Sequence, residues 1–173
     1  MRYFPMFLDM AGRTALLAGG GEQIAQKARL LKRTDARLFI MSEDLIPELA
    51  ALVDAGRADH IAADLDEAAI ADAAYVFIAT EDDDLDLEIA DHARAAGALV
   101  NMVDRPAECD MITPALVDRD PVVVAIGTEG AAGLGECLKS NSSVRTLDLS
   151  GKCGVCVCVL YVWCEGVLRC VYR

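Results

Sequence analysis

Short apolar runs alternate with segments of helical periodicity along the first 103 residues of the chain. In the helical segments apolar residues recur every three or four positions, which is typical of amphipathic helices. The apolar runs have strand length and lie at residues 14–18, 36–41, 58–62, 74–79 and 98–103. The helical segments lie at residues 22–31, 44–55, 66–73 and 87–96. This alternation predicts an α/β fold with a Rossmann-like, doubly wound and mostly parallel sheet.

The first apolar run leads directly into a glycine turn. Three glycines at 19–21 follow the run 14–18, and the helical period begins immediately afterwards. A dinucleotide-binding fold holds its pyrophosphate at such a turn, because glycine lets backbone N–H groups approach the phosphates and the helix dipole favours negative charge. Ile24 occupies the third position of the motif, where glycine or alanine is usual. Taken alone, these residues fit a glycine-rich turn in another α/β protein equally well.

The end of the second predicted strand bears on the choice of cofactor. A dinucleotide fold usually has an acid there for the adenosine ribose, whereas this chain has Ser42, followed by Glu43. Ser42 could instead be the N-cap of the next helix, and we favour this capping role. No lysine or arginine lies between residues 38 and 56, so NAD is favoured over NADP. The residues expected at the cofactor site are Gly19, Gly20, Gly21, Glu22, Gln23, Ile24, Ser42, Glu43, Thr80 and Val103.

A run of acidic residues follows the fourth predicted strand at 81–86. It fits a solvated helix start, where carboxylates complement the helix dipole, or a metal site built from three consecutive aspartates. We favour the helix start, because consecutive residues point in different directions. His60 and His92 are left unassigned, and no protein-bound metal is predicted.

Asp104 directly follows the fifth predicted strand and precedes Arg105-Pro106. Ligands of open α/β sheets bind beyond the carboxyl ends of the strands, so Asp104 is the candidate catalytic residue. The alternative is an ordinary turn aspartate before a proline. Two further apolar runs, at 111–117 and 121–126, are joined by a polar turn.

The charge of the chain limits its partners. The formal net charge is −12, and residues 1–132 carry 11 basic against 25 acidic residues. This excess argues against nucleic acid and against an anionic membrane surface as partners. The N-terminal stretch is too short and too interrupted for a signal peptide, and residues 1–150 contain no run of 18 apolar residues. We therefore expect a cytoplasmic protein.

The order of these segments resembles a known family. The chain is similar to the N-terminal module of siroheme synthase and to its stand-alone relatives, precorrin-2 dehydrogenase/sirohydrochlorin ferrochelatase. The resemblance lies in FPMFLDMAGRTALLAGGG at 4–21, QKARLL at 26–31, FIATEDDDLD at 77–86 and NMVDRPAECDMITPALVDRDPVVVAIGTEGAA at 101–132. It implies NAD-dependent dehydrogenation of the tetrapyrrole precorrin-2 to sirohydrochlorin and insertion of Fe²⁺ as a second substrate. It also implies a homodimer.

The resemblance places the functional aspartate of the family at Asp104, whose carboxylate can accept the proton lost in dehydrogenation. The candidates for binding the substrate are Asn101, Arg105, Thr113, Arg119 and Thr128. For the two arginines an ordinary surface position is the alternative. Two other kinds of protein stay open: an NAD-binding regulatory module without chemistry, and a truncated, inactive relative.

The C-terminal part departs from the resemblance. We expect a NAD-binding domain at 1–112, the start of a dimerisation or substrate segment at 113–132 and a tail outside the family at 133–173. Six of the seven cysteines lie at 137–170, in a spacing that matches no metal site we recognise. The tail lacks helical periodicity and the expected dimerisation helix, which puts the homodimer in doubt. A shifted reading frame would explain it, and finding the same tail in one uninterrupted frame of related genomes would exclude that hypothesis.

Overall fold

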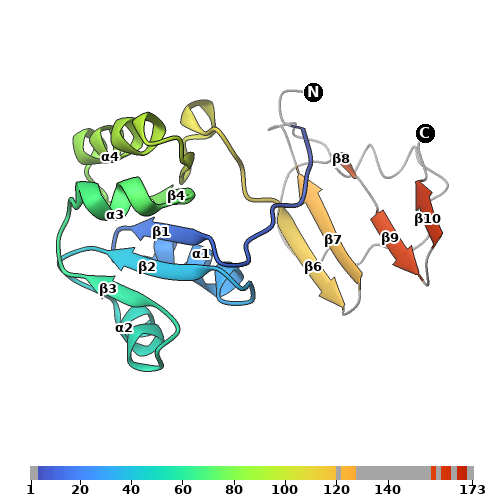
Figure 1. Cartoon of the computed structure of the whole chain (residues 1–173), viewed down its shortest axis with the longest axis horizontal. Helices are drawn as coiled ribbons and strands as arrows, with labels where there is room; N and C mark the ends of the chain where they lie inside the picture. The colour runs from blue at the N-terminus through green and yellow to red at the C-terminus, as the bar shows by residue number, and fades with distance from the viewer. Residues whose placement is uncertain (1–3, 120–121, 128–156, 159–160, 165–166, 171–173) are drawn as a thin grey trace. The chain divides into compact units, whose positions relative to one another are not determined.

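The computed structural model describes residues 4–119 and 122–127 and three further strand segments at 157–158, 161–164 and 167–170 (Figure 1). The chain divides into two compact units. One comprises residues 7–111, and the other contains residues 4–6 and the described residues from 112 onward. Thr128, a predicted substrate residue, and the cysteines at 137, 153 and 156 lie outside the described residues.

The unit of residues 7–111 is built on a five-stranded parallel sheet with the strand order β3-β2-β1-β4-β5. The strands are β1 (Thr14–Ala18), β2 (Arg37–Met41), β3 (Asp59–Ile61), β4 (Tyr75–Ile78) and β5 (Leu99–Met102). Every neighbouring pair in this sheet is parallel. Because all neighbouring strands run parallel, all five carboxyl ends lie at one edge of the sheet. The predicted Rossmann-like fold is confirmed.

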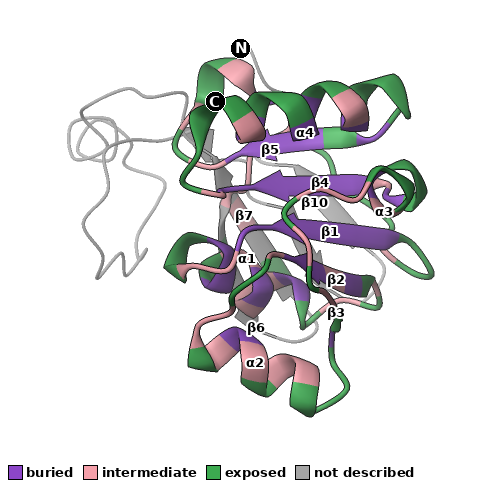
Figure 2. Ribbon diagram, turned by 90° about the vertical axis from the view of Figure 1, so that its left-hand side faces the viewer, coloured by how far each residue is buried: buried purple, intermediate pink, exposed green. Residues whose placement is uncertain are grey.

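Helices cover the sheet with apolar side chains of mixed size. They are α1 (Glu22–Leu31), α2 (Pro47–Asp54), α3 (Glu67–Asp72) and α4 (Asp83–Ala95), and a 3₁₀ turn, η1 (Pro106–Glu108), follows β5. Residues of α1 and α2 share one buried cluster with Ala15 and Leu17 of β1. The alternate residue Leu16 is equally buried, so both faces of β1 are covered. The buried colour runs along β1 and β4 in Figure 2.

The segment between β2 and α2 corrects the capping prediction for Ser42. Helix α2 begins at Pro47, and its N-cap is Ile46 in an extended conformation, without a side-chain cap. Proline favours the first helical position and holds the residue before it extended. The helix therefore begins three residues later than expected, and Ser42 cannot cap it.

The acidic run after β4 is a helix start, as predicted. Asp82 is the N-cap of α4, and its carboxylate accepts hydrogen bonds from the backbone N–H groups of Asp84 (3.0 Å) and Leu85 (3.1 Å). Asp66 caps α3 in the same way. These caps satisfy N–H groups that have no partner within the helix. The carboxylates of the run therefore have a structural role.

Among its described residues, the second unit has strands and no helices. β6 (Ala115–Arg119) and β7 (Val122–Gly127) pair antiparallel, and β8 (Val157–Cys158) pairs with β7. β9 (Tyr161–Cys164) and β10 (Val167–Cys170) form a separate antiparallel pair. Residues 111–114 of the predicted apolar run lie before β6 and not within it. No helix in the described parts of the chain is long and apolar enough to cross a membrane.

Candidate functional site

The glycine turn after β1 lies too close to its neighbours to accept a side chain. Gly19 has φ +123°, and a Cβ there would overlap the backbone oxygen of Ala79 and lie 2.8 Å from its carbonyl carbon. A Cβ on Gly20 would overlap the backbone oxygen of Asp44 and lie 2.9 Å from its carbonyl carbon. The turn is also hydrogen-bonded to the end of β2, through Gly19 N and Met41 O at 2.9 Å. These contacts require glycine at both positions.

A cavity of about 290 Å³ opens beside this turn, at the carboxyl edge of the sheet. Its lining residues are Gly20, Gly21, Asp44, Leu45, Ile46, Ala79, Thr80 and Glu81. The volume is at the lower end of the range of about 300–1,000 Å³ for small-molecule sites. The lining contains two acidic residues and no basic residue, which suits ribose hydroxyl groups better than a 2′-phosphate.

The cavity contains three of the predicted cofactor residues: Gly20, Gly21 and Thr80. Sequence reasoning missed Asp44, Leu45 and Ile46 because it assigned them to a helix. It also missed Glu81, although this residue follows Thr80 at a strand end, where ligands bind. Glu81 has φ +70°, an uncommon conformation for a residue with a side chain.

The other predicted cofactor residues lie around the turn in different environments. Ile24 is fully buried, so its side chain supports the turn from the core. Glu22 is exposed and pairs with Arg29 at 2.9 Å. Val103 donates its backbone N–H to Ile78 O at 3.0 Å. The exposed Glu43 donates its backbone N–H to Asp64 Oδ1 at 3.4 Å.

Ser42 lies close to the glycine turn. Its Oγ would be 2.9 Å from a Cβ on Gly20. Its backbone N–H donates to Ile61 O at 3.1 Å, and its carbonyl oxygen is 2.9 Å from His60 Nε2. With the capping role excluded, a contact between Ser42 and the cofactor remains a prediction.

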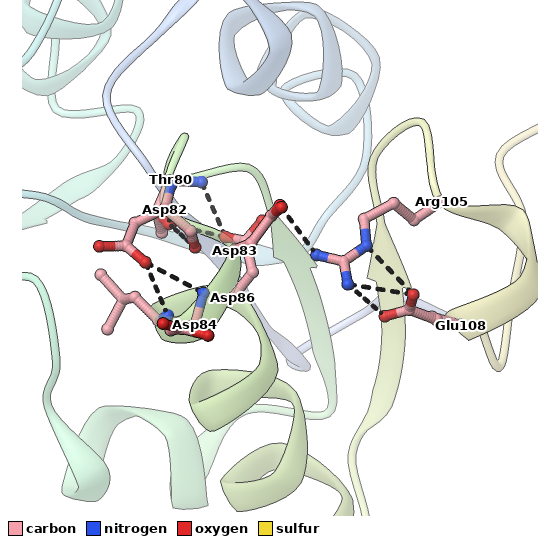
Figure 3. Close-up of polar contacts among 8 residues, drawn as sticks. Thr80, Asp82, Asp83, Asp84, Asp86, Arg105 and Glu108 are labelled. Atoms are coloured by element: carbon pink, nitrogen blue, oxygen red, sulfur yellow. Dashed lines mark hydrogen bonds and ion pairs between the residues drawn. The ribbon is translucent and has the colours of Figure 1, made fainter.

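Thr80 is held in place by a buried carboxylate. Both its backbone N–H and its hydroxyl donate to Asp86 Oδ1, at 3.0 and 2.7 Å (Figure 3). The side chain of Asp86 comes from the first turn of α4 and is buried with the rest of that residue. The end of β4 is thus tied to α4 at the wall of the cavity.

Asp104 lies at the same edge of the sheet as the glycine turn. It has φ +62°, and its Oδ2 accepts a hydrogen bond of 2.8 Å from Gln23 Nε2. Gln23 belongs to the first turn of α1, which directly follows the glycines. The structure therefore brings the carboxylate that follows β5 to the start of the first crossover helix, as expected.

Lys27 is a member of this site that sequence reasoning missed. It is half-buried and lies one helical turn after Gln23 on α1. Burial lowers its pKa, while the negative charge of Asp104 and the thiol of Cys109 act in the opposite direction. The sequence feature that could have identified Lys27 was its spacing of four residues from Gln23, which places both on one face of α1. Only the position of β5 shows that this face meets Asp104.

Arg105 is bound by two carboxylates of its own chain. Its Nε and Nη2 donate to Glu108 Oε1 at 3.2 and 3.0 Å, and its Nη1 donates to Asp83 Oδ1 at 3.2 Å (Figure 3). The hydrogen bond to Glu108 is the main reason why the pKa of Arg105 is raised. These contacts join the loop carrying Asp104 to the start of α4. Binding of substrate by Arg105 stays a prediction and would compete with these acids.

The remaining predicted substrate residues are not brought together by the described geometry. Asn101 is buried, and its amide donates to Met111 O at 2.9 Å, which gives it a structural role. Thr113 and Arg119 belong to the other compact unit, and Thr128 lies outside the described residues. In the described part of the chain, no group of three or more His, Cys, Asp or Glu residues could hold a metal ion.

A parallel sheet of this strand order, with a glycine turn whose backbone is open to a cavity, defines a dinucleotide-binding domain. The turn packs tightly against Ala79 and Asp44, which requires glycine at positions 19 and 20. Backbone N–H groups at the start of the following helix are a binding site for a pyrophosphate. The chain belongs to the family described as "Putative NAD(P)-binding", whose model matches residues 6–115.

Sequence matches to known proteins are consistent with this family assignment. The chain is 39% identical over 132 residues to the siroheme synthase of Stutzerimonas stutzeri (strain A1501). It is 40% identical over 132 residues to that of Pseudomonas aeruginosa (strain UCBPP-PA14). Each match covers 76% of this chain but only 28% of the relative. The resemblance found in the sequence is thus confirmed over 132 residues of this chain.

A solved structure described as SirC, precorrin-2 dehydrogenase, has the same fold. The TM-score is 0.65, over 79% of this chain and 68% of that one. At 21% sequence identity, this likeness supports the fold alone.

Proposed function

We propose that this protein catalyses the NAD-dependent dehydrogenation of precorrin-2 to sirohydrochlorin, with Asp104 as the proton acceptor. The observation that carries the proposal is the hydrogen bond of 2.8 Å between Gln23 and Asp104. It joins the carboxylate that follows β5 to the helix that follows the glycine turn. The relatives named siroheme synthase support the choice of reaction and substrate.

Different residues of the chain bind the cofactor and accept the proton in this reaction. The backbone of the glycine turn and the start of α1 hold the pyrophosphate, and Thr80 and Asp44 line the adjoining cavity. When NAD⁺ is bound, it supplies a hydride acceptor. The carboxylate of Asp104 accepts the proton that leaves as the macrocycle gains a double bond, so that the two hydrogens lost are accounted for.

The substrate carries many carboxylates and meets an acidic protein. Local cations must therefore bind it, because the overall field of the chain opposes it. We propose Arg105 for this role. Substrate contacts of Thr113, Arg119 and Thr128 stay predictions from the resemblance, whereas the buried Asn101 has a structural role. Arg119 and Thr113 are assigned to the start of a dimerisation or substrate segment at 113–132. The homodimer and a cytoplasmic location are parts of the same proposal.

The test is to incubate the full chain with precorrin-2 and NAD⁺ and to follow the formation of NADH. We expect turnover by the wild type, and a loss of about 10²–10⁴-fold in Asp104→Asn with unchanged affinity for NAD⁺. Asp91→Asn, which changes an exposed carboxylate of α4, is the matched control and should retain full activity. Addition of Fe²⁺ or Co²⁺ afterwards shows from the chlorin spectrum whether metal insertion follows.

The outcomes separate the three kinds of protein. Binding of NAD⁺ without turnover by the wild type would reject the proposal and favour a regulatory module or an inactive relative. Full activity of Asp104→Asn would remove Asp104 from the mechanism while leaving the reaction in place.

A further inference from the structure

The contact between Gln23 and Asp104 gives Gln23 a role other than binding the cofactor. The two residues are 81 positions apart in the sequence, yet the amide Nε2 lies 2.8 Å from Oδ2 of the carboxylate. Gln23 was predicted at the cofactor site, and in the structure its amide donates to Asp104. Asp104 lies in a left-handed backbone conformation, with φ +62°, which is uncommon for residues other than glycine.

A hydrogen bond of this kind does two things to a carboxylate. It stabilises the ionised form, which is the form that can accept a proton, and it fixes one of the two oxygens. The other oxygen, Oδ1, has no recorded hydrogen bond to the described residues and stays available. A neutral donor suits a base better than a close cation, because a direct ion pair would hold the proton acceptor too strongly in its charged form.

Among the described residues, the charged groups near Asp104 make no direct contact with its carboxylate, so Gln23 is its hydrogen-bond partner. On α1, Lys27 acts on Asp104 through its charge without an ion pair within 4 Å. On the segment after β5, Arg105 is bound to Glu108 and Asp83. Cys109 is buried, and its thiol donates to the carbonyl oxygen of Met102 at 3.1 Å.

We infer that Gln23 is a positioning residue, which fixes the Asp104 carboxylate beside the first turn of the cofactor-binding helix. The inference rests on the proposed function for its catalytic consequence only. It connects the two halves of the site, since the helix that receives the pyrophosphate at its N-terminus also orients the proton acceptor.

The test compares Gln23→Leu and Gln23→Glu with the wild type. Leucine removes the donor at similar size, and glutamate places a second carboxylate opposite the first. Gln26→Leu is the matched control, because Gln26 is an exposed glutamine on the same helix with no recorded contact to Asp104. Gln23 is also exposed, so the variants are expected to fold, and thermal melting of each variant verifies this.

Two readouts decide the inference. In ¹³C NMR of the labelled aspartates at one fixed pH, the Asp104 carboxyl signal should move in Gln23→Leu, which removes its hydrogen-bond donor, and stay in place in Gln26→Leu. The kcat for precorrin-2 oxidation should fall about tenfold in Gln23→Leu, with an unchanged Kd for NAD⁺.

Contrary results overturn the inference in distinct ways. An Asp104 carboxyl signal that is unchanged in Gln23→Leu would reject it. A weaker binding of NAD⁺ with an unchanged carboxyl signal would make Gln23 a cofactor contact instead. If the wild type does not oxidise precorrin-2, the proposed function fails, while the NMR signal still decides whether Gln23 holds the carboxylate.

Discussion

The glycine turn allows a quantitative test of the cofactor site through Gly19→Ala. The new methyl group would overlap the backbone oxygen of Ala79 and lie 3.2 Å from Ile24 Cγ1. Neither neighbour can move freely, because Ala79 follows β4 and donates its own N–H to Ala18 O at 2.9 Å, and Ile24 is fully buried. The substitution must therefore displace the turn itself.

Two separate costs are expected. The φ of +123° at Gly19 is unfavourable for any L-residue, at about 1–3 kcal/mol. The overlap with the backbone of Ala79 adds about 1–3 kcal/mol, the usual range for inserting a methylene into a packed site. We thus expect a loss of about 2–6 kcal/mol from the free energy of unfolding, out of about 5–15 kcal/mol for a typical protein.

Gly56→Ala is the matched control. Gly56 also has a positive φ, +64°, but a Cβ there would meet nothing within 4 Å. It should lose about 1–2 kcal/mol, for the backbone conformation alone. Urea denaturation of both variants, together with calorimetric titration of NAD⁺, separates the two costs. We also expect Gly19→Ala to bind NAD⁺ at least tenfold more weakly, which corresponds to about 1.4 kcal/mol. Equal stability losses in the two variants would refute the close approach of the turn to β4.

Two other substitutions test the surroundings of the site. Asp86→Ala leaves the backbone N–H of Thr80 without its acceptor, so the free energy of unfolding in urea should fall by about 1–3 kcal/mol. Asp84→Ala removes an exposed carboxylate of the same turn and should lower it by less than about 1 kcal/mol. Equal losses in the two variants would contradict the role of Asp86. The folded-state pKa of Lys27 is lowered from its ordinary value of 10.5, so unfolding takes up a proton in the window below pH 10.5 and stability rises with pH there. Chemical denaturation repeated from pH 7 to 10.5 should show no such rise in stability for Lys27→Met. The rise should remain in the control Lys32→Met, which replaces an exposed lysine. The same pH dependence in both variants would contradict the burial of Lys27.

The match to siroheme synthases covers only part of their length. The chain spans about 28% of the length of the relatives that it matches. The groups proposed to hold the cofactor and to accept the proton, namely the glycine turn, its cavity and Asp104, lie at one edge of the sheet. The segment predicted to start dimerisation or substrate binding lies after residue 112, where the described chain is a set of paired strands.

Local sequence patterns predicted the elements well because each depends on near neighbours. Apolar runs and helical periods located all five strands and four helices of the sheet unit, and the position of Asp104 after a strand followed from the same pattern. The helix start in the acidic run 81–86 was predicted because carboxylates complement the dipole of a helix start, whereas Asp82 as its cap came from the structure. Ser42 was assigned wrongly since a serine before an apolar segment resembles a cap, while Pro47 determines where the helix begins.

The sequence by itself determined the order of strands and helices, the glycines that approach other backbone atoms and the carboxylate at the end of β5. Only the tertiary structure decided what that carboxylate meets. Gln23 and Lys27 come within its reach because β4 lies between β1 and β5, a strand order that results from packing of distant segments. Periodicity reports which residues face the core, but contacts between residues 81 positions apart depend on how the sheet is assembled.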